Sequence, residues 1–468
     1  MIPLSTSPAR ESRSFGSGLP IRVICHGCGY QLPEEEAVLL TCPRARGGDD
    51  IDHVLAREVD ASRLLFPAVD DPNPFVRYRV LTYGYHRARM NGWSDGDVVS
   101  LIRRLDAQVA RVDGHGFSVT PMHRADELAA HLGLAGPMFV KDETGNVSGS
   151  HKARHLFGTL LELELAGDAA PTAAYPLAIA SCGNAALAAA VVARAAQRPL
   201  RVFIPADADP SMVERLRALH AEVVACPREA GEAGDPTYRR LLEALRAGAF
   251  PFTCQGNLNG MAIEGGMTLG WEIVSHLLER RERLDHLVVQ VGGGALASAL
   301  TQSLLEAHRL GALARPPRIH TVQTQGAAPL ARAHGRASAR LFDNAAPMAI
   351  DLELAAAAQH RSAFMWPWES EPRSIAHGIL DDETYDWLAV TRGMLLTDGR
   401  ALVVDEATLA DANELGRTTT GIDADATGTA GLAGVIELQR RGEIRPGESV
   451  AVIFTGVRRE SAANGGHP

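Results

Sequence analysis

The chain has 468 residues, of which 46% are hydrophobic and 22% charged, as expected of a globular protein with material for two or more cores. Its formal net charge of -10 argues against a nucleic-acid-binding surface, which needs a concentrated basic stripe. No run approaches the roughly 18 to 20 uninterrupted apolar residues of a membrane helix, and the first residues show no signal-peptide segment. We therefore expect a cytoplasmic protein that acts on a small molecule, without a nucleic-acid or membrane partner.

Cysteines are few, and three of them cluster near the N-terminus. Six in a chain of this length are too sparse for the disulfide framework of a secreted protein, so we expect reduced thiols. Cys25, Cys28 and Cys42 have a Cys-x2-Cys and Cys-Pro spacing that begins like a zinc ribbon. A fourth cysteine is missing, and His53 is the nearest substitute, ahead of Asp50 or Asp52. Residues 1–60 are thus predicted to form a tail and a degenerate zinc-ribbon-like knuckle, which either binds zinc through Cys25, Cys28, Cys42 and His53 or is held by packing alone.

Residues 61–115 are predicted to be helical. Apolar residues recur at helical intervals from 74 to 112 on both sides of an Asn91-Gly92 break, which indicates two helices. Arg77, Tyr78 and Arg79 form a basic and aromatic cluster within this segment. These side chains either face an anionic ligand or a partner subunit, or are ordinary packing and ion-paired surface groups.

Beyond residue 137, short apolar runs alternate with helical stretches, a pattern typical of parallel sheets covered by helices. Strands are predicted at 137–143, 176–181, 201–205, 222–226, 250–254, 286–291, 318–323, 401–406 and 449–456, with helices between them. This predicts an α/β fold with mostly parallel sheets. In such sheets ligands bind beyond the carboxyl ends of the strands.

Four of the predicted strand-to-helix turns contain residues suited to ligand binding or covalent chemistry. Lys152 opens a helix, where the backbone dipole disfavours a free cation, and a lysine amine can instead condense with a carbonyl such as that of pyridoxal phosphate (PLP). The turn at 181–185 offers amides and a hydroxyl for a carboxylate, and the three glycines at 292–294 allow close approach of a phosphate. The turn at 423–431 offers hydroxyl and carboxylate groups for a ring nitrogen.

In this order, the four turns resemble those of the fold type II PLP-dependent enzymes, which include threonine synthase, threonine and serine dehydratases, cysteine synthase and the tryptophan synthase β chain. GNVSGSHK looks like the family's lysine segment, SCGNA like its substrate loop, VGGGALASAL like its phosphate loop and DATGTAGLAG like the threonine synthase version of the ring-nitrogen loop. The resemblance covers about 115–457. It implies a PLP catalytic core over 116–468, with a smaller subdomain at about 145–260 inserted in the large domain.

The resemblance also implies residue roles. Lys152 would form the Schiff base (internal aldimine) and serve as the acid/base at the α carbon, and His151 either donates to the cofactor phosphate or is a structural histidine. Thr427 would face the pyridine nitrogen, with Asp425 as a rival. The other cofactor contacts would be Asn184 at the ring hydroxyl and Gly292, Gly293, Gly294, Ala295 and Leu296 at the phosphate. The substrate carboxylate would be held by Ser181, Cys182, Gly183, Asn184 and Ala185.

These roles imply a PLP-dependent lyase similar to threonine synthase, which forms an external aldimine with an amino acid and catalyses β or γ elimination or replacement. A serine/threonine dehydratase and a cysteine synthase-like β-replacement enzyme are the alternatives, because Val147, His151, Ala153 and Ala185 depart from the threonine synthase pattern. Arg154, His155 and the cluster at 77–79 are candidates for a substrate phosphate, and 366–386 for a substrate rim or dimer contact. The resemblance further implies a homodimer.

Overall fold

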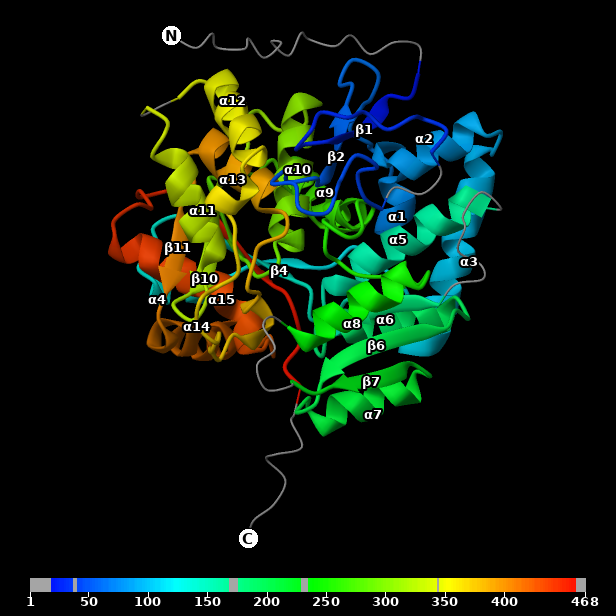
Figure 1. The fold of residues 1–468 in the computed structure, drawn as a ribbon. Helices are drawn as coiled ribbons and strands as arrows, with labels where there is room; N and C mark the ends of the chain where they lie inside the picture. Colours follow the sequence, from blue (N-terminus) through cyan, green and yellow to red (C-terminus); the bar gives the residue numbers. More distant parts are fainter. Residues whose placement is uncertain (1–17, 37–39, 168–175, 229–234, 343–344, 460–468) are drawn as a thin grey trace, which may run out of the picture.

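The protein is described here by a computed structural model that covers residues 18–36, 40–167, 176–228, 235–342 and 345–459 (Figure 1). The terminal tails that the sequence predicts lie mostly at 1–17 and 460–468, outside the described residues. None of the described helices is long and apolar enough to cross a membrane.

A six-stranded sheet forms one core, in the order β11-β10-β9-β12-β4-β3. Neighbouring strands run parallel except β3, which is antiparallel to β4. β9 and β12 are buried along their whole length, because helices cover both faces of a central parallel strand. The strands are β3 (Met122–Arg124), β4 (Met138–Asp142), β9 (His286–Gln290), β10 (Arg318–Thr324), β11 (Ala401–Val404) and β12 (Val450–Phe454).

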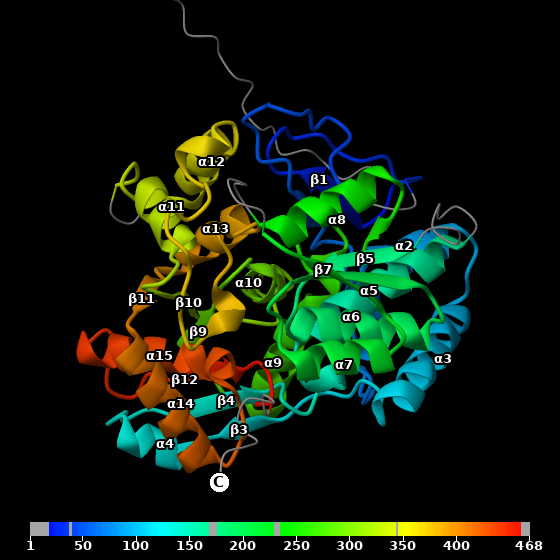
Figure 2. The same cartoon turned by 60° about the horizontal axis from the view of Figure 1, so that its bottom comes forward.

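A four-stranded parallel sheet, in the order β7-β6-β5-β8, forms a second core. Its strands are β5 (Leu177–Ala180), β6 (Leu200–Pro205), β7 (Glu222–Cys226) and β8 (Phe250–Pro251). The associated helices are α5 (Lys152–Ala166), α6 (Asn184–Ala195), α7 (Pro210–Ala218) and α8 (Pro236–Arg246). Figure 2 shows this group beside the larger sheet, with α9 (Ala262–Arg280) and α10 (Ala295–Arg309) between the two.

Helices around the larger sheet complete the layers on its two faces. They are α4 (Asp126–His131), α9 (Ala262–Arg280), α10 (Ala295–Arg309), α11 (Pro329–Ser338), α12 (Pro347–Ala358), α13 (Trp387–Thr397), α14 (Glu406–Thr420) and α15 (Ala426–Arg440). The N-terminal part adds an antiparallel pair, β1 (Ile21–Cys25) and β2 (Leu55–Val59), and three helices, α1 (Pro74–Arg77), α2 (Tyr83–Met90) and α3 (Asp95–Asp113).

The prediction of only two helices between 74 and 112 was wrong in its first half. A break separates α1 from α2, with a 3₁₀ turn at Arg79–Leu81 and an extended Thr82. The break has a physical cause, because buried carboxylates of distant helices accept the first amides of α2: Glu264 binds that of Tyr83 at 2.9 Å and Glu162 that of Gly84 at 3.0 Å. These acceptors start a new helix at Tyr83.

Candidate active site

Lys152 is the first residue of α5, directly after a tight turn. Ser148 and Gly149 both have positive φ, 59° and 68°, so the chain turns sharply before the lysine. A Cβ on Gly149 would lie 2.7 Å from Val457, which explains the glycine there. The turn therefore places Lys152 at the first position of a helix whose other residues are mostly buried.

The sequence contains only two lysines, Lys141 and Lys152. Lys141 is fully buried and its amine is 2.6 Å from Glu272, which holds it as an ion pair. Lys152 is half-buried, and the structure records no hydrogen bond to its amine within the described part of the chain. Lys152 is thus the one lysine of this chain whose amine is accessible in the described structure.

Asp381 connects Lys152 with the glycine turn. Its side chain is half-buried, and the Lys152 amine is among the groups that act on it electrostatically. On the other side, a Cβ on Gly292 would lie 2.3 Å from Asp381 Oδ2 and one on Gly293 would lie 3.3 Å from Oδ1. Burial raises the pKa of Asp381, although Lys152 and the amide of Gly293 favour the charged carboxylate. The glycine turn therefore lies against a carboxyl group that the charge of Lys152 also influences.

The glycine turn follows β9 and opens α10. Gly294 has φ 97°, in the left-handed region, so glycine suits this position. The next amides, of Ala295, Leu296 and Ala297, have no acceptor within the helix because they belong to its first turn. Such a turn attracts an anion.

The segment 376–386 packs directly on this turn. Thr384 Oγ1 donates to the carbonyl of Gly292 at 2.9 Å, and the amide of Tyr385 donates to that of Gly293 at 2.9 Å. The sequence suggested that this region forms either a substrate rim or a dimer contact. In the structure it packs against the glycine turn and forms one wall beside it. Asp381, which belongs to this wall, was not singled out from the sequence.

The turn at 181–185 lies at the carboxyl end of β5 and opens α6. Cys182 is exposed and the other four residues of the turn are half-buried, so the backbone amides of the turn remain accessible. The side chain of Asn184 is held by Arg459, whose Nη1 donates to Asn184 Oδ1. Arg459 was also missed from the sequence, because it lies at the end of the chain that was expected to fray.

Thr427 and Asp425 take different places at the start of α15. Asp425 is the N-cap, and its carboxylate accepts the amide of Gly428. Thr427 Oγ1 accepts the amide of Gly378 at 3.0 Å, which leaves its own proton free to donate. Gln290, at the end of β9, donates to the carbonyl of Thr427 at 3.0 Å and so links this turn to the glycine turn.

The other basic candidates form hydrogen bonds and ion pairs with other residues of the fold. His151 Nδ1 donates to the carbonyl of Thr455 at 3.2 Å, and burial lowers its pKa well below the usual range, which favours the neutral ring. Arg154 and His155 are fully buried, bound to carboxylates and to the carbonyl of Ala262, so the suggestion that they receive a substrate phosphate was wrong. They lie on the face of α5 that packs against α9.

The cluster at 77–79 is likewise structural. Tyr78 is fully buried and its hydroxyl lies 2.8 Å from that of Ser275. Arg77 pairs with Glu279 at 2.5 Å and Arg79 with Asp95 at 2.7 Å. The alternative of packing and ion-paired groups therefore describes this cluster.

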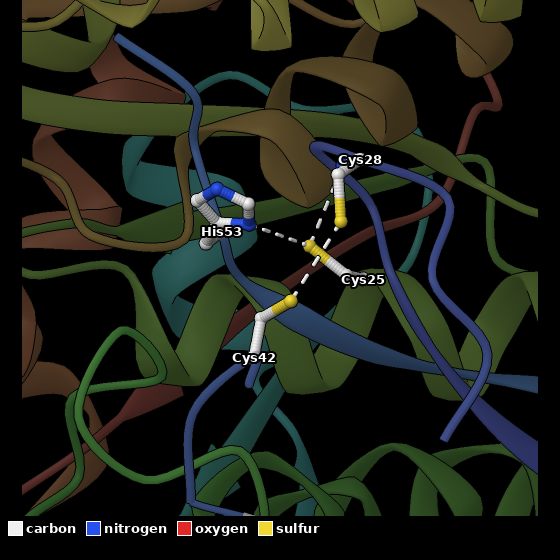
Figure 3. Close-up of side chains that lie close together, drawn as sticks. All are labelled: Cys25, Cys28, Cys42 and His53. Carbon is white, nitrogen blue, oxygen red and sulfur yellow. Dashed lines mark hydrogen bonds between the residues drawn. The ribbon is translucent and has the colours of Figure 1, made fainter. Parts of the chain in front are cut away.

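The cysteine knuckle brings together the four side chains that the sequence selected (Figure 3). The ligand atoms of Cys25, Cys28, Cys42 and His53 all lie within 4.8 Å of one another. The Sγ atoms of Cys28 and Cys42 are 3.7 Å apart, and Cys25 Sγ is 3.4 Å from His53 Nδ1. A tetrahedron with zinc–ligand bonds of about 2.3 and 2.05 Å has edges of roughly 3.8 and 3.6 Å, close to these separations.

The carboxylate of Asp49 contacts the ring nitrogen of His53 that does not face the cysteines. Asp49 Oδ2 is 3.3 Å from the second ring nitrogen of His53, an arrangement that orients a metal-binding imidazole. Asp50 and Asp52, the weaker alternatives, are used elsewhere: Asp50 accepts the amide of Ser362 at 2.7 Å and Asp52 lies 3.4 Å from Arg361 Nε. The arrangement suits a divalent metal with sulfur and nitrogen ligands.

Comparison with known proteins gives the family. The family model described as "Pyridoxal-phosphate dependent enzyme" matches residues 115–456. Threonine synthase of Bacillus sp. (strain ULM1) is 25% identical over 340 residues, which cover 72% of this chain and 82% of that protein. L-serine dehydratase of Saccharomyces cerevisiae (strain YJM789) is 29% identical over 195 residues, which cover 40% of this chain and 56% of that protein.

Solved structures agree with the fold. Maize serine racemase superimposes with a TM-score of 0.57 at 19% identity, covering 77% of this chain and 94% of that one. Processed threonine deaminase isoform 2 of Solanum lycopersicum gives a TM-score of 0.56 at 16% identity, covering 79% of this chain and 92% of that one. The predicted fold class and family are thereby confirmed, and the chain belongs to the fold type II PLP-dependent enzymes.

Proposed function

We propose that this protein is a PLP-dependent lyase that acts on an amino acid with a leaving group at the β or γ carbon. The observation that carries the proposal is that Lys152, the only accessible lysine, shares Asp381 as a neighbour with the glycine turn at 292–294. A covalent amine and a phosphate-binding turn are needed on the two sides of one site for this cofactor.

The residues present fit the cofactor. The unpartnered first amides of α10 suit its phosphate, and the half-buried amine at the start of α5 suits its aldehyde. Asn184 lies near enough to the Lys152 turn, through Arg459 and Ser148, to serve the ring oxygen. When bound, the cofactor withdraws electrons from the α carbon of an amino acid.

The hydroxyl of Thr427 favours elimination or replacement over transamination. Because Thr427 Oγ1 already accepts the amide of Gly378, its proton can be donated to a neutral pyridine nitrogen. A nitrogen kept neutral by this hydroxyl would make the bound cofactor a weaker electron sink than a protonated one, which would favour loss of a β or γ group. The use of Asp425 as the N-cap of α15 supports Thr427 as the partner of the nitrogen.

The protein's own groups supply the remaining functions. The amides of the 181–185 turn, at the start of α6, bind the substrate carboxylate. The amine of Lys152 removes and returns the proton at the α carbon. The wall at 376–386 covers the glycine turn and shields the site from water.

A substrate panel tests the proposal. The PLP-loaded protein is incubated with O-phosphohomoserine, threonine or serine, and released phosphate and oxoacid are measured. We expect phosphate release from the first, as in a threonine synthase, whereas oxoacid from threonine or serine would identify the dehydratase instead. A protein with an intact cofactor absorbance band that releases neither product and performs no β replacement would contradict the lyase assignment.

The knuckle is proposed to bind one zinc ion through Cys25, Cys28, Cys42 and His53. Two ligand separations close to the edges of a zinc tetrahedron, and the support of His53 by Asp49, carry this proposal. Elemental analysis of the purified protein should find about one zinc per chain, and Cys42→Ser should lose it while keeping PLP. A metal-free wild-type protein that takes up no added zinc would contradict it.

A further inference from the structure

The last described segment of the chain, residues 455–459, forms a strap beside the candidate active site. After β12, the amide of Val457 donates to the carbonyl of Gly149 at 2.9 Å, and that of Arg458 donates to the carbonyl of Asp423 at 2.8 Å. The strap, residues 455–459, thus lies between the turn that carries Lys152 and the turn that carries Thr427 (Figure 1, the red end between α15 and α8).

Arg459 reaches from the strap to two turns at once. Its Nη2 donates to the carbonyl of Ser148 at 2.6 Å, and its Nη1 donates to Asn184 Oδ1. Ser148 precedes Lys152 by four residues, whereas Asn184 is the first residue of α6, the helix that follows β5 of the four-stranded sheet. One guanidinium therefore ties the lysine turn to the substrate turn.

We infer that Arg459 is a positioning residue, which fixes the side-chain amide of Asn184 so that its nitrogen donates to the bound cofactor. This inference rests on the function proposed above. Arginine has five donors and no acceptor, so the atom of Asn184 that faces it must be the oxygen. The amide nitrogen must then point the other way.

The surroundings of Asn184 leave that nitrogen available. The structure records no acceptor for Asn184 Nδ2 among the described residues, and the side chain is half-buried rather than enclosed. A Cβ on Gly456 would lie 2.7 Å from Nδ2, so a glycine in the strap makes room for the amide. The strap therefore both orients Asn184 and leaves space beside it.

The charge of Arg459 adds to this effect. Within the described part of the chain no carboxylate forms an ion pair with its guanidinium. Burial, and then the charge of Arg215, lowers the pKa of Arg459, whereas Asp425 and Asp113 favour its charged form. These two carboxylates accept the amides of Gly428 and Ser148 respectively. A cation behind the amide polarises its N–H groups and strengthens their hydrogen bond to an anionic ring oxygen.

Arg459→Gln tests the inference, with Arg458→Gln as a matched control on the same strap. Arg458 is half exposed and pairs with Asp423 at 2.9 Å, away from Asn184. We expect Arg459→Gln to weaken PLP binding about tenfold and to shift the maximum and the pH titration of the visible cofactor band. Arg458→Gln should change neither, and Arg459→Lys should fall between them because an ammonium cannot bridge two acceptors as a planar fork does.

The double variant separates positioning from general damage. In an Asn184→Ala background, Arg459→Gln should change the PLP dissociation constant less than about twofold, because its target is gone. Additive effects of the two substitutions, or equal spectra for Arg459→Gln and Arg458→Gln, would overturn the inference. If instead the wild type shows no Lys152-dependent band, the proposed function itself fails.

Discussion

Two buried clusters of charged side chains flank α5, and they differ in their balance of charge. The first lies behind Lys152 and contains Lys141, Glu143, Arg154 and Glu272, two cations against two carboxylates. Arg154 Nε is 2.8 Å from Glu143 and its Nη1 is 2.6 Å from Glu272. Burial alone would raise the pKa of Glu272, but Arg154 and Lys141 together lower it.

The second cluster lies toward the knuckle and has an excess of acid. Arg57 and Arg87 lie against Glu162, Glu264 and Glu306, and the charge of the exposed Arg309 also acts on Glu306. Burial, and then the charge of Glu264, raises the pKa of Glu162 to about 8, and burial raises that of Glu306 to about 7. At neutral pH this cluster therefore retains a proton.

The two clusters therefore hold α5 at two different places, its start and its middle. The balanced ion pairs hold the start of α5, where Lys152 lies, through the guanidinium of Arg154. The acidic cluster holds the middle of α5 against α2 and β2 of the knuckle, and its contribution to stability changes with pH. The variants below test this contrast in order of expected effect.

Breaking the balanced cluster should have the largest effect. Arg154→Met leaves Glu143 and Glu272 buried with only Lys141 to neutralise them, so we expect the free energy of unfolding to fall by about 3 to 5 kcal/mol in denaturant titrations. Arg154→Lys, which keeps the positive charge, should lower the free energy of unfolding by less than Arg154→Met. Arg103→Met is the control, since it removes an exposed pair with Asp71 and should cost under about 1 kcal/mol.

Equal stability losses in Arg154→Met and Arg103→Met would contradict the role given to the balanced cluster. A further requirement is that Arg154→Met weakens PLP binding, because the start of α5 would lose its anchor.

Removing the titrating acid should change the pH profile of stability. The folded pKa of Glu162, about 8, lies above its unfolded value, so unfolding releases a proton and stability falls as pH rises from about 5 to about 8. Glu162→Gln keeps an acceptor for the amide of Gly84 and should remove a fall on the order of 2 kcal/mol across this window. Glu164→Gln, two residues along α5, is the control, and identical pH profiles for the two variants would refute the assignment.

Asp381 belongs to neither cluster and should give the smallest effect. Its carboxyl lies against Gly292 and Gly293, so it competes with a phosphate anion for the same turn. We expect Asp381→Asn to tighten the binding of PLP about tenfold while hardly changing that of pyridoxal, which has no phosphate. Asp382→Asn is the neighbouring control, and an equal change for both ligands in Asp381→Asn would exclude competition at the turn.

Local sequence patterns predicted much of the fold. Central parallel strands are continuous apolar runs between turn residues, so β9 and β12 and the turns after them could be placed from the sequence. The spacing of the cysteines likewise selected His53, because the nearest histidine that follows Cys42 lies within reach of a zinc-ribbon fold.

Contacts between distant segments could not be predicted in this way. Asp381 meets the glycine turn some 90 positions earlier, and Arg459 meets Asn184 across 275 positions. Arg154 and His155 were misjudged because the sequence gives their helix but not which of its faces packs against α9. One signal was available, however: two lysines in the whole chain already point to Lys152.

Covalent trapping of the cofactor tests the central claim most directly. The protein is incubated with PLP, reduced with borohydride and digested, and the modified peptide is identified by mass spectrometry. We predict one pyridoxyl group per chain, on Lys152, and none on Lys152→Ala. Modification of Lys141, or no modification of a folded protein at saturating PLP, would contradict the account.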